Sequence, residues 1–519
     1  MRGSTRTSRI AAYVASGALV VSGTILAATP AEAVTYDPQP ANDAAAWLAD
    51  ELDTGMFSGA FAQGLSIDAA LALDEIGGQN PAVTGVSSAL EPVVEDYISY
   101  EDYVYAGSAA KAAVLAQVAG DDATAYGGYD LIAEIAGKVV TASPASGRVP
   151  DTNVLGQAFA SRSLAVAGSP LAADVTDYLL NQQCAAGYFR LDYNSDPTAA
   201  NQSCVDGTDS PDTDVTAIVV TQLRAQTPTP AITSAISKAE AWLVAQQRCD
   251  GSYGGGTSTE ESNANSTGLV SWALGDSPTS RQAAGWLRNH QATAADSGNS
   301  LASETGAIAY NDLGLASGRA DGITEPKKDE WRRATAQAAP GIRWFSSDAT
   351  PAINLSGPTG YVKQGTSQVL STTGADAGTV LCVTGSGAST RGIAGVSGWS
   401  SRVTVPAGTA TRAYTVRDAY GHDDTAAVKV LGPKTLPIYK SKSRVKRSGW
   451  VTARIGGLAS GESAKIYYKG NLVRTGKATT AGVFSASFRV GRSLGLKRIT
   501  GLGQFGDIRR GSTTVRVVR

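Results

Sequence analysis

Residues 242–274 read WLVAQQRCDGSYGGGTSTEESNANSTGLVSWAL, and this stretch decides the fold. The pattern predicts an apolar helix that ends at Gln246-Gln247, a turn at Asp250–Tyr253, and a second apolar helix from Asn265 onward. Weaker copies of this two-helix unit recur along the first two-thirds of the chain. Because each unit buries its apolar face only against its neighbours, the repeat predicts one continuous helical array.

The copies align best at the start of their second helix. These starts are 63–66, 105–108, 151–156, 212–217, 263–268 and 303–306. An aromatic residue followed by leucine marks several first helices, at Trp47, Tyr178, Trp242 and Trp286. Six such hairpins predict an all-α, α6/α6 toroid of about twelve helices in two layers, inner and outer.

Past Trp344 the pattern changes to short β-rich runs separated by glycine, proline, aspartate and serine. Two blocks of these runs predict two all-β, immunoglobulin-like sandwiches with a boundary at Gly432-Pro433. The first block has expected strands at 362–371, 378–384, 401–406, 411–417 and 425–431, and the second at 450–455, 463–468, 482–490, 498–502 and 512–518. We therefore expect a multidomain chain with a linker at 34–40, the toroid at 41–346 and sandwiches at 347–432 and 433–519.

The first 33 residues have the composition of a secretory signal peptide. Three arginines precede an apolar run over 10–28, and Ala31-Glu32-Ala33 forms an A-x-A cleavage site. Cleavage before Val34 predicts a secreted protein, free or associated with the cell wall, without a membrane span. The alternative is an uncleaved membrane anchor, because the apolar run is long.

The four cysteines of an exported chain are expected to be paired. Cys184 and Cys204 flank one long polar insertion, so we expect a disulfide between them. Cys249 occupies nearly the same place in its copy as Cys184 in the preceding one, which makes it an alternative partner for Cys204. Cys382 lies in a strand-like run of another domain and is expected to be unpaired.

Charge divides the chain into two parts of opposite sign. Residues 433–519 carry 19 Lys and Arg against Glu462 and Asp507, a formal charge of +17, whereas residues 34–432 carry −21. A basic domain on an exported protein predicts an anionic polymer as partner, such as wall teichoic acid, acidic polysaccharide or extracellular nucleic acid. The alternatives are a solubilising surface and docking onto the acidic toroid. The cations follow no nucleic-acid-binding motif, so sequence-specific nucleic-acid recognition is not expected.

The repeat resembles that of the prenyltransferase and squalene-cyclase superfamily, whose toroid has six inner and six outer helices. The resemblance rests on Gln183 with Gly187-Tyr188-Phe189 and on Gln247 with Gly251-Ser252-Tyr253, which are similar to the family's glutamine–aromatic motif. It covers about residues 41–345. The same toroid serves cyclases, prenyltransferases and non-catalytic ligand binders, so the resemblance implies a fold and leaves the function open.

The run Asp212-Thr213-Asp214-Val215-Thr216-Ala217 is similar to the D-x-D-D-T-A motif of squalene–hopene-type cyclases. By that resemblance Asp212 and Asp214 are the catalytic candidates, and Asp214 would protonate an alkene. Val215 stands where the family has a further aspartate, so the carboxylate cluster is incomplete. The aligned positions in other copies are Asn153 and Asn265, and we interpret all three as helix N-caps in preference to a proton donor.

Other chemistry has fewer candidates. His290 and His422 are the only histidines and lie in separate domains, so we expect no histidine-based metal centre or catalytic triad. The acidic loop 192–214 begins like a calcium loop but has Pro197 at the usual glycine. We expect no cofactor, with weak Ca²⁺ binding by that loop as an alternative to a solvated acidic loop.

Two functions remain open. The first is an extracellular binding protein in which the toroid holds or displays a ligand and residues 433–519 attach to anionic wall polymer or acidic polysaccharide. The second is a secreted enzyme, either terpene-cyclase-like or active on polysaccharide, the latter through paired carboxylates such as Glu260-Glu261. In either case we expect the site where the inner helices begin. The candidate ligand-binding residues there are Tyr188, Tyr253, Asn265 and Glu304.

Overall fold

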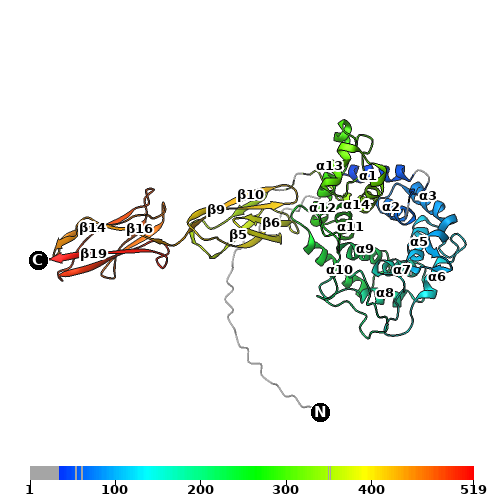
Figure 1. Ribbon diagram of the computed structural model, residues 1–519, viewed down its shortest axis with the longest axis horizontal. Helices are drawn as coiled ribbons and strands as arrows, with labels where there is room; N and C mark the ends of the chain where they lie inside the picture. The colour runs from blue at the N-terminus through cyan, green and yellow to red at the C-terminus, as the bar shows by residue number, and fades with distance from the viewer. Residues whose placement is uncertain (1–33, 53–54, 60–61, 349, 351) are drawn as a thin grey trace, which may run out of the picture. The chain divides into compact units, whose positions relative to one another are not determined.

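A computed structural model describes residues 34–52, 55–59, 62–348, 350 and 352–519 (Figure 1). The expected signal peptide at 1–33 lies outside the described residues. No described helix is long and apolar enough to cross a membrane.

Six inner helices form a closed ring. They are α2 (Ala62–Ile76), α5 (Ala106–Ala119), α7 (Val154–Val166), α9 (Thr213–Arg224), α11 (Ala264–Leu274) and α14 (Lys328–Ile342). Each packs against the next in this order, and α14 packs against α2. Small residues allow this close approach: a Cβ on Gly268 of α11 would lie 2.3 Å from the Cα of Ala338 in α14.

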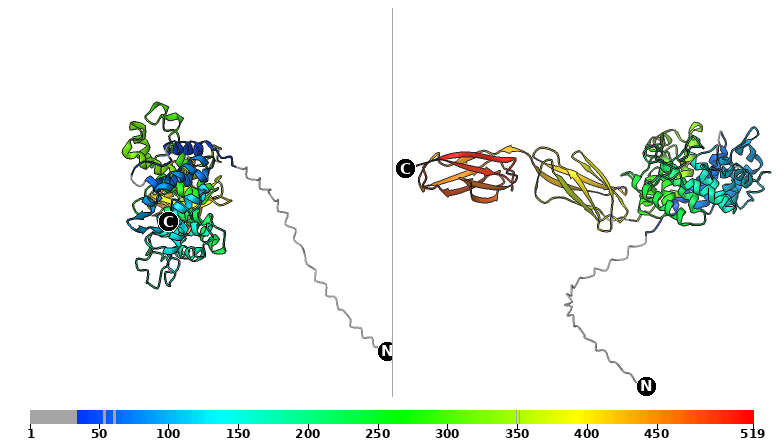
Figure 2. Two further views of the ribbon diagram at one scale, coloured as in Figure 1. Left: turned by 90° about the vertical axis from the view of Figure 1, so that its right-hand side faces the viewer. Right: turned by 90° about the horizontal axis from the view of Figure 1, so that it is seen from below.

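Six outer helices cover the ring, as Figures 1 and 2 show from three directions. They are α1 (Gln39–Glu51), α3 (Asn80–Leu90), α6 (Leu131–Lys138), α8 (Ala172–Leu180), α10 (Pro230–Gln246) and α12 (Pro278–Asn289). Each packs against at least one inner helix. The short α4 (Val94–Ile98) and α13 (Asp312–Asp321) lie outside this repeat. The described helices therefore form the two layers expected from the repeated hairpins.

The repeated glutamine ties neighbouring outer helices together. The side-chain amide of Gln183, just after α8, donates to Gly187 O at 2.9 Å and to Ala235 O of α10 at 2.8 Å. Gln247 joins α10 to α12 in the same way, through Gly251 O and Thr279 O. Gln291, after α12, repeats the arrangement through Gly306 O at 3.2 Å and Pro40 O of α1 at 2.8 Å. These last bonds join the end of the toroid to its beginning.

The expected helix start at 303–306 is wrong. Gly306 is the turn glycine bonded by Gln291, equivalent to Gly251 rather than to the start of an inner helix. The next residues are extended, and Ile308 N donates to the Thr335 hydroxyl of α14 at 2.9 Å, as Tyr253 N does to Thr267 of α11. An insertion that contains α13 delays the sixth inner helix to Lys328.

Residues 353–431 form two sheets around one hydrophobic core. The five-stranded sheet has the order β4 (Tyr361–Lys363), β10 (Asp423–Leu431), β9 (Ala410–Asp418), β6 (Val380–Gly385) and β7 (Ala388–Ile393). The three-stranded sheet has the order β3 (Asn354–Ser356), β5 (Ser367–Thr373) and β8 (Trp399–Thr404). Leu370, Val383 and Tyr414 are among the core residues. The expected strand 362–371 is divided in two by a turn at Gly365, whose φ is +70°.

Residues 434–518 form a second pair of sheets. The six-stranded sheet contains β11 (Lys434–Thr435), β19 (Arg509–Val518), β18 (Gly495–Leu502), β15 (Ser463–Tyr468) and β16 (Asn471–Lys477) in this order, and β13 (Arg444–Lys446) pairs with β19. The other sheet is β12 (Ile438–Lys440), β14 (Trp450–Ile455) and β17 (Phe484–Arg489). The β-rich region expected beyond the toroid is therefore present, and its immunoglobulin-like topology stays a prediction.

The described residues contain two disulfides. Cys184 is bonded to Cys204, as expected for the polar insertion. Cys249 is bonded to Cys382 of β6, so neither the alternative pairing of Cys249 with Cys204 nor an unpaired Cys382 occurs. The reason is that β6 packs beside α12, whose Gln282 exchanges two hydrogen bonds with the backbone of Val380. Cys249 follows the end of α10, which Gln247 ties to α12. This disulfide joins the toroid to the first β-domain.

Candidate functional site

Asparagine or aspartate side chains cap the N-termini of three inner helices, α7, α9 and α11. In α9 and α11 the capping residue lies two positions before the residue that the sequence predicts. Asp212 caps α9 by accepting from Asp214 N at 2.9 Å and Val215 N at 3.1 Å. Asn263 caps α11 in the same way, and Asn153 caps α7. The capping interpretation is therefore wrong for Asp214 and Asn265, which are the second residues of their helices. The error in alignment arose because a polar Asx residue stands at both positions.

The carboxyl of Asp214 is buried, and its Oδ1 has no hydrogen-bond partner. Burial raises the pKa of Asp214 to about 6, the neighbouring Asp212 carboxyl adds to the rise, and the Ser266 and Thr213 hydroxyls offset part of it. The glycine run 254–256 lies directly over both aspartates. A Cβ on Gly255 would lie 2.5 Å from Asp214 Oδ2 and 2.2 Å from Thr259 Oγ1, so a larger residue would displace these side chains.

Asp214→Asn is expected to stabilise the protein at alkaline pH. A carboxyl whose pKa is raised in the folded state binds its proton more tightly there than in the unfolded chain. The folded state is therefore penalised as pH rises from about 4 through about 6, and the penalty is full above that. We expect the variant to gain about 3 kcal/mol at pH 8 and almost nothing at pH 3.5. Urea denaturation at the two pH values measures this.

The exposed Asp321 of α13 provides the control, because Asp321→Asn removes a carboxyl that no neighbour buries. It is expected to leave the stability nearly unchanged at both pH values. If Asp214→Asn is less stable than the wild type at pH 8, the prediction is wrong, because the ionised carboxylate then stabilises the folded state.

The other candidate ligand-binding residues lie mostly in the wall of the toroid. Tyr188 is buried and its hydroxyl donates to Asp209 O at 2.7 Å, and Tyr253 is buried completely. Glu304 accepts from Trp47 Nε1 at 2.9 Å and so holds α1. Asn265 is the second residue of α11, as Asp214 is of α9, and these two helices pack against each other. The structure thus does not bring the predicted residues into one site.

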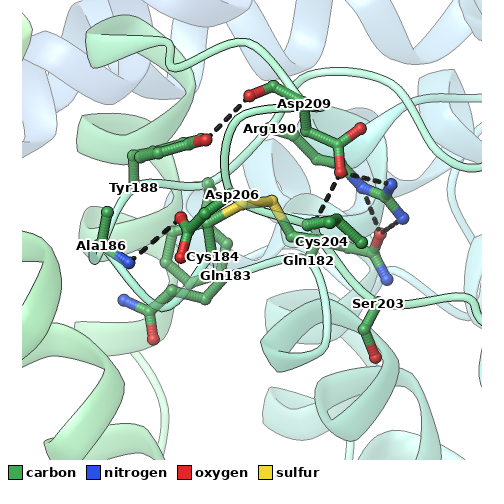
Figure 3. The surroundings of a disulfide bond; sticks show 12 residues. Gln182, Gln183, Cys184, Ala186, Tyr188, Arg190, Ser203, Cys204, Asp206 and Asp209 are labelled. Atoms are coloured by element: carbon green, nitrogen blue, oxygen red, sulfur yellow. Dashed lines mark hydrogen bonds and ion pairs between the residues drawn. A yellow bond between two sulfur atoms is a disulfide. The ribbon is translucent and has the colours of Figure 1, made fainter.

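The insertion 184–214 uses its acidic side chains internally, as Figure 3 shows around the disulfide. Asp209 pairs with Arg190 at 3.1 Å and accepts from Val205 N, and Asp206 accepts from Ala186 N. Within the described residues, the one group of possible metal ligands joins Asp209 to Cys184 and Cys204, whose sulfurs form the disulfide. These contacts give the carboxylates a structural role in holding the insertion.

The basic domain has almost no acidic surface. Glu462 is buried against Arg509, and Asp507 pairs with Lys363 of the preceding domain. Of the other lysines and arginines in 433–519, all are exposed except Lys440 and Lys497, which are half-buried. The formal charge of this domain is therefore carried almost entirely on its surface.

One face of the six-stranded sheet concentrates these cations, and we call it the basic face. Strand pairing places Arg444 of β13 directly opposite Arg516 of β19, and Arg516 opposite Leu496. Arg498 lies opposite Thr514 on the same face, and alternation also brings Arg510 there. Like charges directly opposite one another destabilise a sheet unless an anion lies between them. The charge of this domain follows from its composition, but this face does not, because its arginines come from three strands and are separated in the sequence.

No protein-family model and no curated protein matches the chain. Among solved structures, the type II terpene cyclase MstE from Scytonema is similar at 15% identity over 59% of this chain and 96% of that chain, with a TM-score of 0.39. The unsaturated glucuronyl hydrolase from Bacillus sp. GL1 is similar at 12% identity over 60% of this chain and 100% of that chain, with a TM-score of 0.39. The Yersinia pseudotuberculosis adhesin InvE is similar at 13% identity over 32% of this chain and 59% of that chain, with a TM-score of 0.18. Similarities at these TM-scores identify neither a family nor an activity.

Proposed function

We propose that this protein is an extracellular binding protein that attaches to anionic cell-wall polymer through its basic face and carries the toroid as its ligand-binding or display domain. The observation that carries the proposal is the cross-strand arrangement of Arg444, Arg498 and Arg516 on one exposed sheet face. Two disulfides support an extracellular location, since such bonds persist mainly in oxidising compartments.

The basic face favours a polymer with a charged backbone and no bases. Guanidinium groups bind phosphate or carboxylate in a bidentate manner, and the hydroxyls of Ser512, Thr514 and Thr500 beside them supply further donors. Proteins that bind single-stranded nucleic acid add exposed aromatic rings on which bases stack. The two exposed rings of this domain, Tyr439 and Trp450, lie on β12 and β14 of the opposite sheet. On the basic face, the ring of Tyr467 is half-buried opposite Thr500.

Replacing the three arginines of the basic face is expected to detach the protein from walls. The variant carries Arg444→Gln, Arg498→Gln and Arg516→Gln in the mature chain. It is mixed with purified Gram-positive cell walls and sedimented over a series of salt concentrations. We expect the apparent affinity to fall by at least about tenfold at low salt, and the dependence on salt to become shallower, because fewer counterions are released.

The matched control removes the same charge elsewhere, through Arg454→Gln, Arg489→Gln and Arg492→Gln, whose side chains are also exposed. It is expected to lose much less affinity. Equal losses in both variants would contradict a defined face and indicate diffuse attraction by net charge. Failure of the wild-type chain to sediment with walls at low salt would overturn the attachment itself.

The alternative of a secreted enzyme is favoured by one observation, the buried Asp214 carboxyl with its raised pKa. The glycine run over it weighs against this alternative. With Gly255 and Gly256 this close to the two carboxylates, backbone occupies the space that a substrate would need. The binding function is therefore the one that the geometry supports better.

A further inference from the structure

A cavity of about 310 Å³ opens at the end of the ring opposite to Asp214. Its walls come from the C-terminal ends of α2, α7, α9, α11 and α14, and five of the six inner helices therefore contribute to it. This volume lies at the lower limit of the usual range for small-molecule sites. We had expected a site where the inner helices begin, and the structure places the cavity where they end.

Charged side chains of both signs line this cavity, and most of them are already paired. Arg343 forms an ion pair with Glu75, and Arg224 forms one with Glu240. Leu71 and the indole of Trp272 supply an apolar part of the wall. These ion pairs hold the helix ends together. Two charged side chains that line the cavity form no ion pair among the described residues.

Arg162 and Asp74 are these two charges. Arg162 donates to Gln222 Oε1 at 3.2 Å, has a buried Nε without a partner, and forms no ion pair with any described residue. Burial lowers its pKa. The side chain of Asp74 has neither a hydrogen bond nor an ion pair within the described chain, and it is exposed to solvent at the mouth of the cavity. Partial burial raises its pKa, and the attraction of Arg162 offsets part of that rise. The two groups line the same cavity without contacting each other.

We propose that this cavity binds a small zwitterion, an amino acid or a dipeptide, with its carboxylate on Arg162 and its ammonium on Asp74. A simple anion would meet the Asp74 and Glu75 carboxylates and the negative ends of the helix dipoles, and a simple cation would meet three guanidinium groups. A zwitterion places an opposite charge on each of the two groups. The gain is expected to be larger at Arg162, whose buried Nε has no partner, because a desolvated charge is stabilised by an opposite one in hydrogen-bonding contact. Leu71 and Trp272 would contact its apolar side chain.

The proposal rests on the proposed role of the toroid as the ligand-binding domain. The test is calorimetric titration of the full mature chain with the L-amino acids and with L- and D-dialanine. We expect at least one of them to bind. The N-acetylated form, which lacks the ammonium, and the amide, which lacks the carboxylate, should bind roughly tenfold more weakly or worse.

Arg162→Gln and Asp74→Asn are each expected to weaken binding by roughly tenfold or more. The matched controls, Arg333→Gln on α14 and Asp321→Asn on α13, change exposed residues and should bind as the wild type does. Unaltered thermal unfolding of the unliganded variants shows that they are folded, and Arg162→Lys, which keeps the charge, should bind with intermediate affinity.

Three outcomes would overturn the proposal: no binding by any probe, undiminished binding in Arg162→Gln, or equal binding by the N-acetylated and amidated forms. None of these would affect sedimentation with cell walls, so failure of this inference is distinguishable from failure of the attachment through the basic face.

Discussion

Glu462→Ala is expected to destabilise the basic domain by about 3–5 kcal/mol, because it leaves Arg509 as an unpaired charge in the core. Glu462 is 0% exposed and Arg509 is 1% exposed. The carboxylate accepts from Arg509 Nε and from the adjacent terminal nitrogen, each at 2.7 Å. It also accepts from Ala459 N and Gln504 N, so its loss breaks four hydrogen bonds. Hydrogen exchange of peptides from β18 and β19 in the full chain measures the effect.

The domain's other acidic residue provides the control. Asp507 is exposed and pairs with Lys363, and Asp507→Ala is expected to change the stability little, because water screens a surface ion pair. The double variant Glu462→Met with Arg509→Met removes both charges and should recover most of the lost stability. If Glu462→Ala exchanges as slowly as the wild type, the buried pair is not what holds these strands. Loss of the fold should also abolish sedimentation with cell walls.

The toroid was predictable because its repeat contains a hydrogen-bonding residue as well as an apolar pattern. Gln183 and Gln247 each end an outer helix and are followed four residues later by a turn glycine, so two copies align without the structure. The copy at Gln291 was misaligned because its turn glycine, Gly306, comes fifteen residues later. A short run such as Ser303–Gly306 resembles the polar start of a helix equally well.

The candidate sites depend on long-range pairing, which the sequence does not specify. The charge of the basic domain is a property of composition and was predicted. The basic face requires β13 to lie parallel to β19 with Arg444 opposite Arg516, a register between segments about seventy residues apart. Arg162 and Asp74 meet at one cavity only because the ring closes. Local signals such as the N-cap of Asp212 describe one helix end and carry no information on such distant partners.

Replacing both Cys249 and Cys382 by serine is expected to cause the largest loss of stability among the cysteine variants. The bond joins residues 133 positions apart, and in the chain-entropy model closing a loop of this length stabilises the folded state by about 4–5 kcal/mol. The same model gives about 3 kcal/mol for Cys184–Cys204, whose separation is 20 residues. Denaturant unfolding of the two double variants under oxidising conditions compares these values directly.

The first β-domain would then be held to the toroid by side chains alone. Arg391 of β7 donates to Val244 O at 2.9 Å, Gln282 bonds the backbone of Val380, and Tyr420 donates to Pro278 O. Hydrogen exchange at the end of α10 should rise in the cysteine variant and rise further when Arg391→Gln is added, whereas Arg391→Gln alone should have little effect. Equal exchange in all of these variants would mean that the domains do not depend on one another. A dependence on the disulfide would mean that reduction loosens the toroid from the first β-domain.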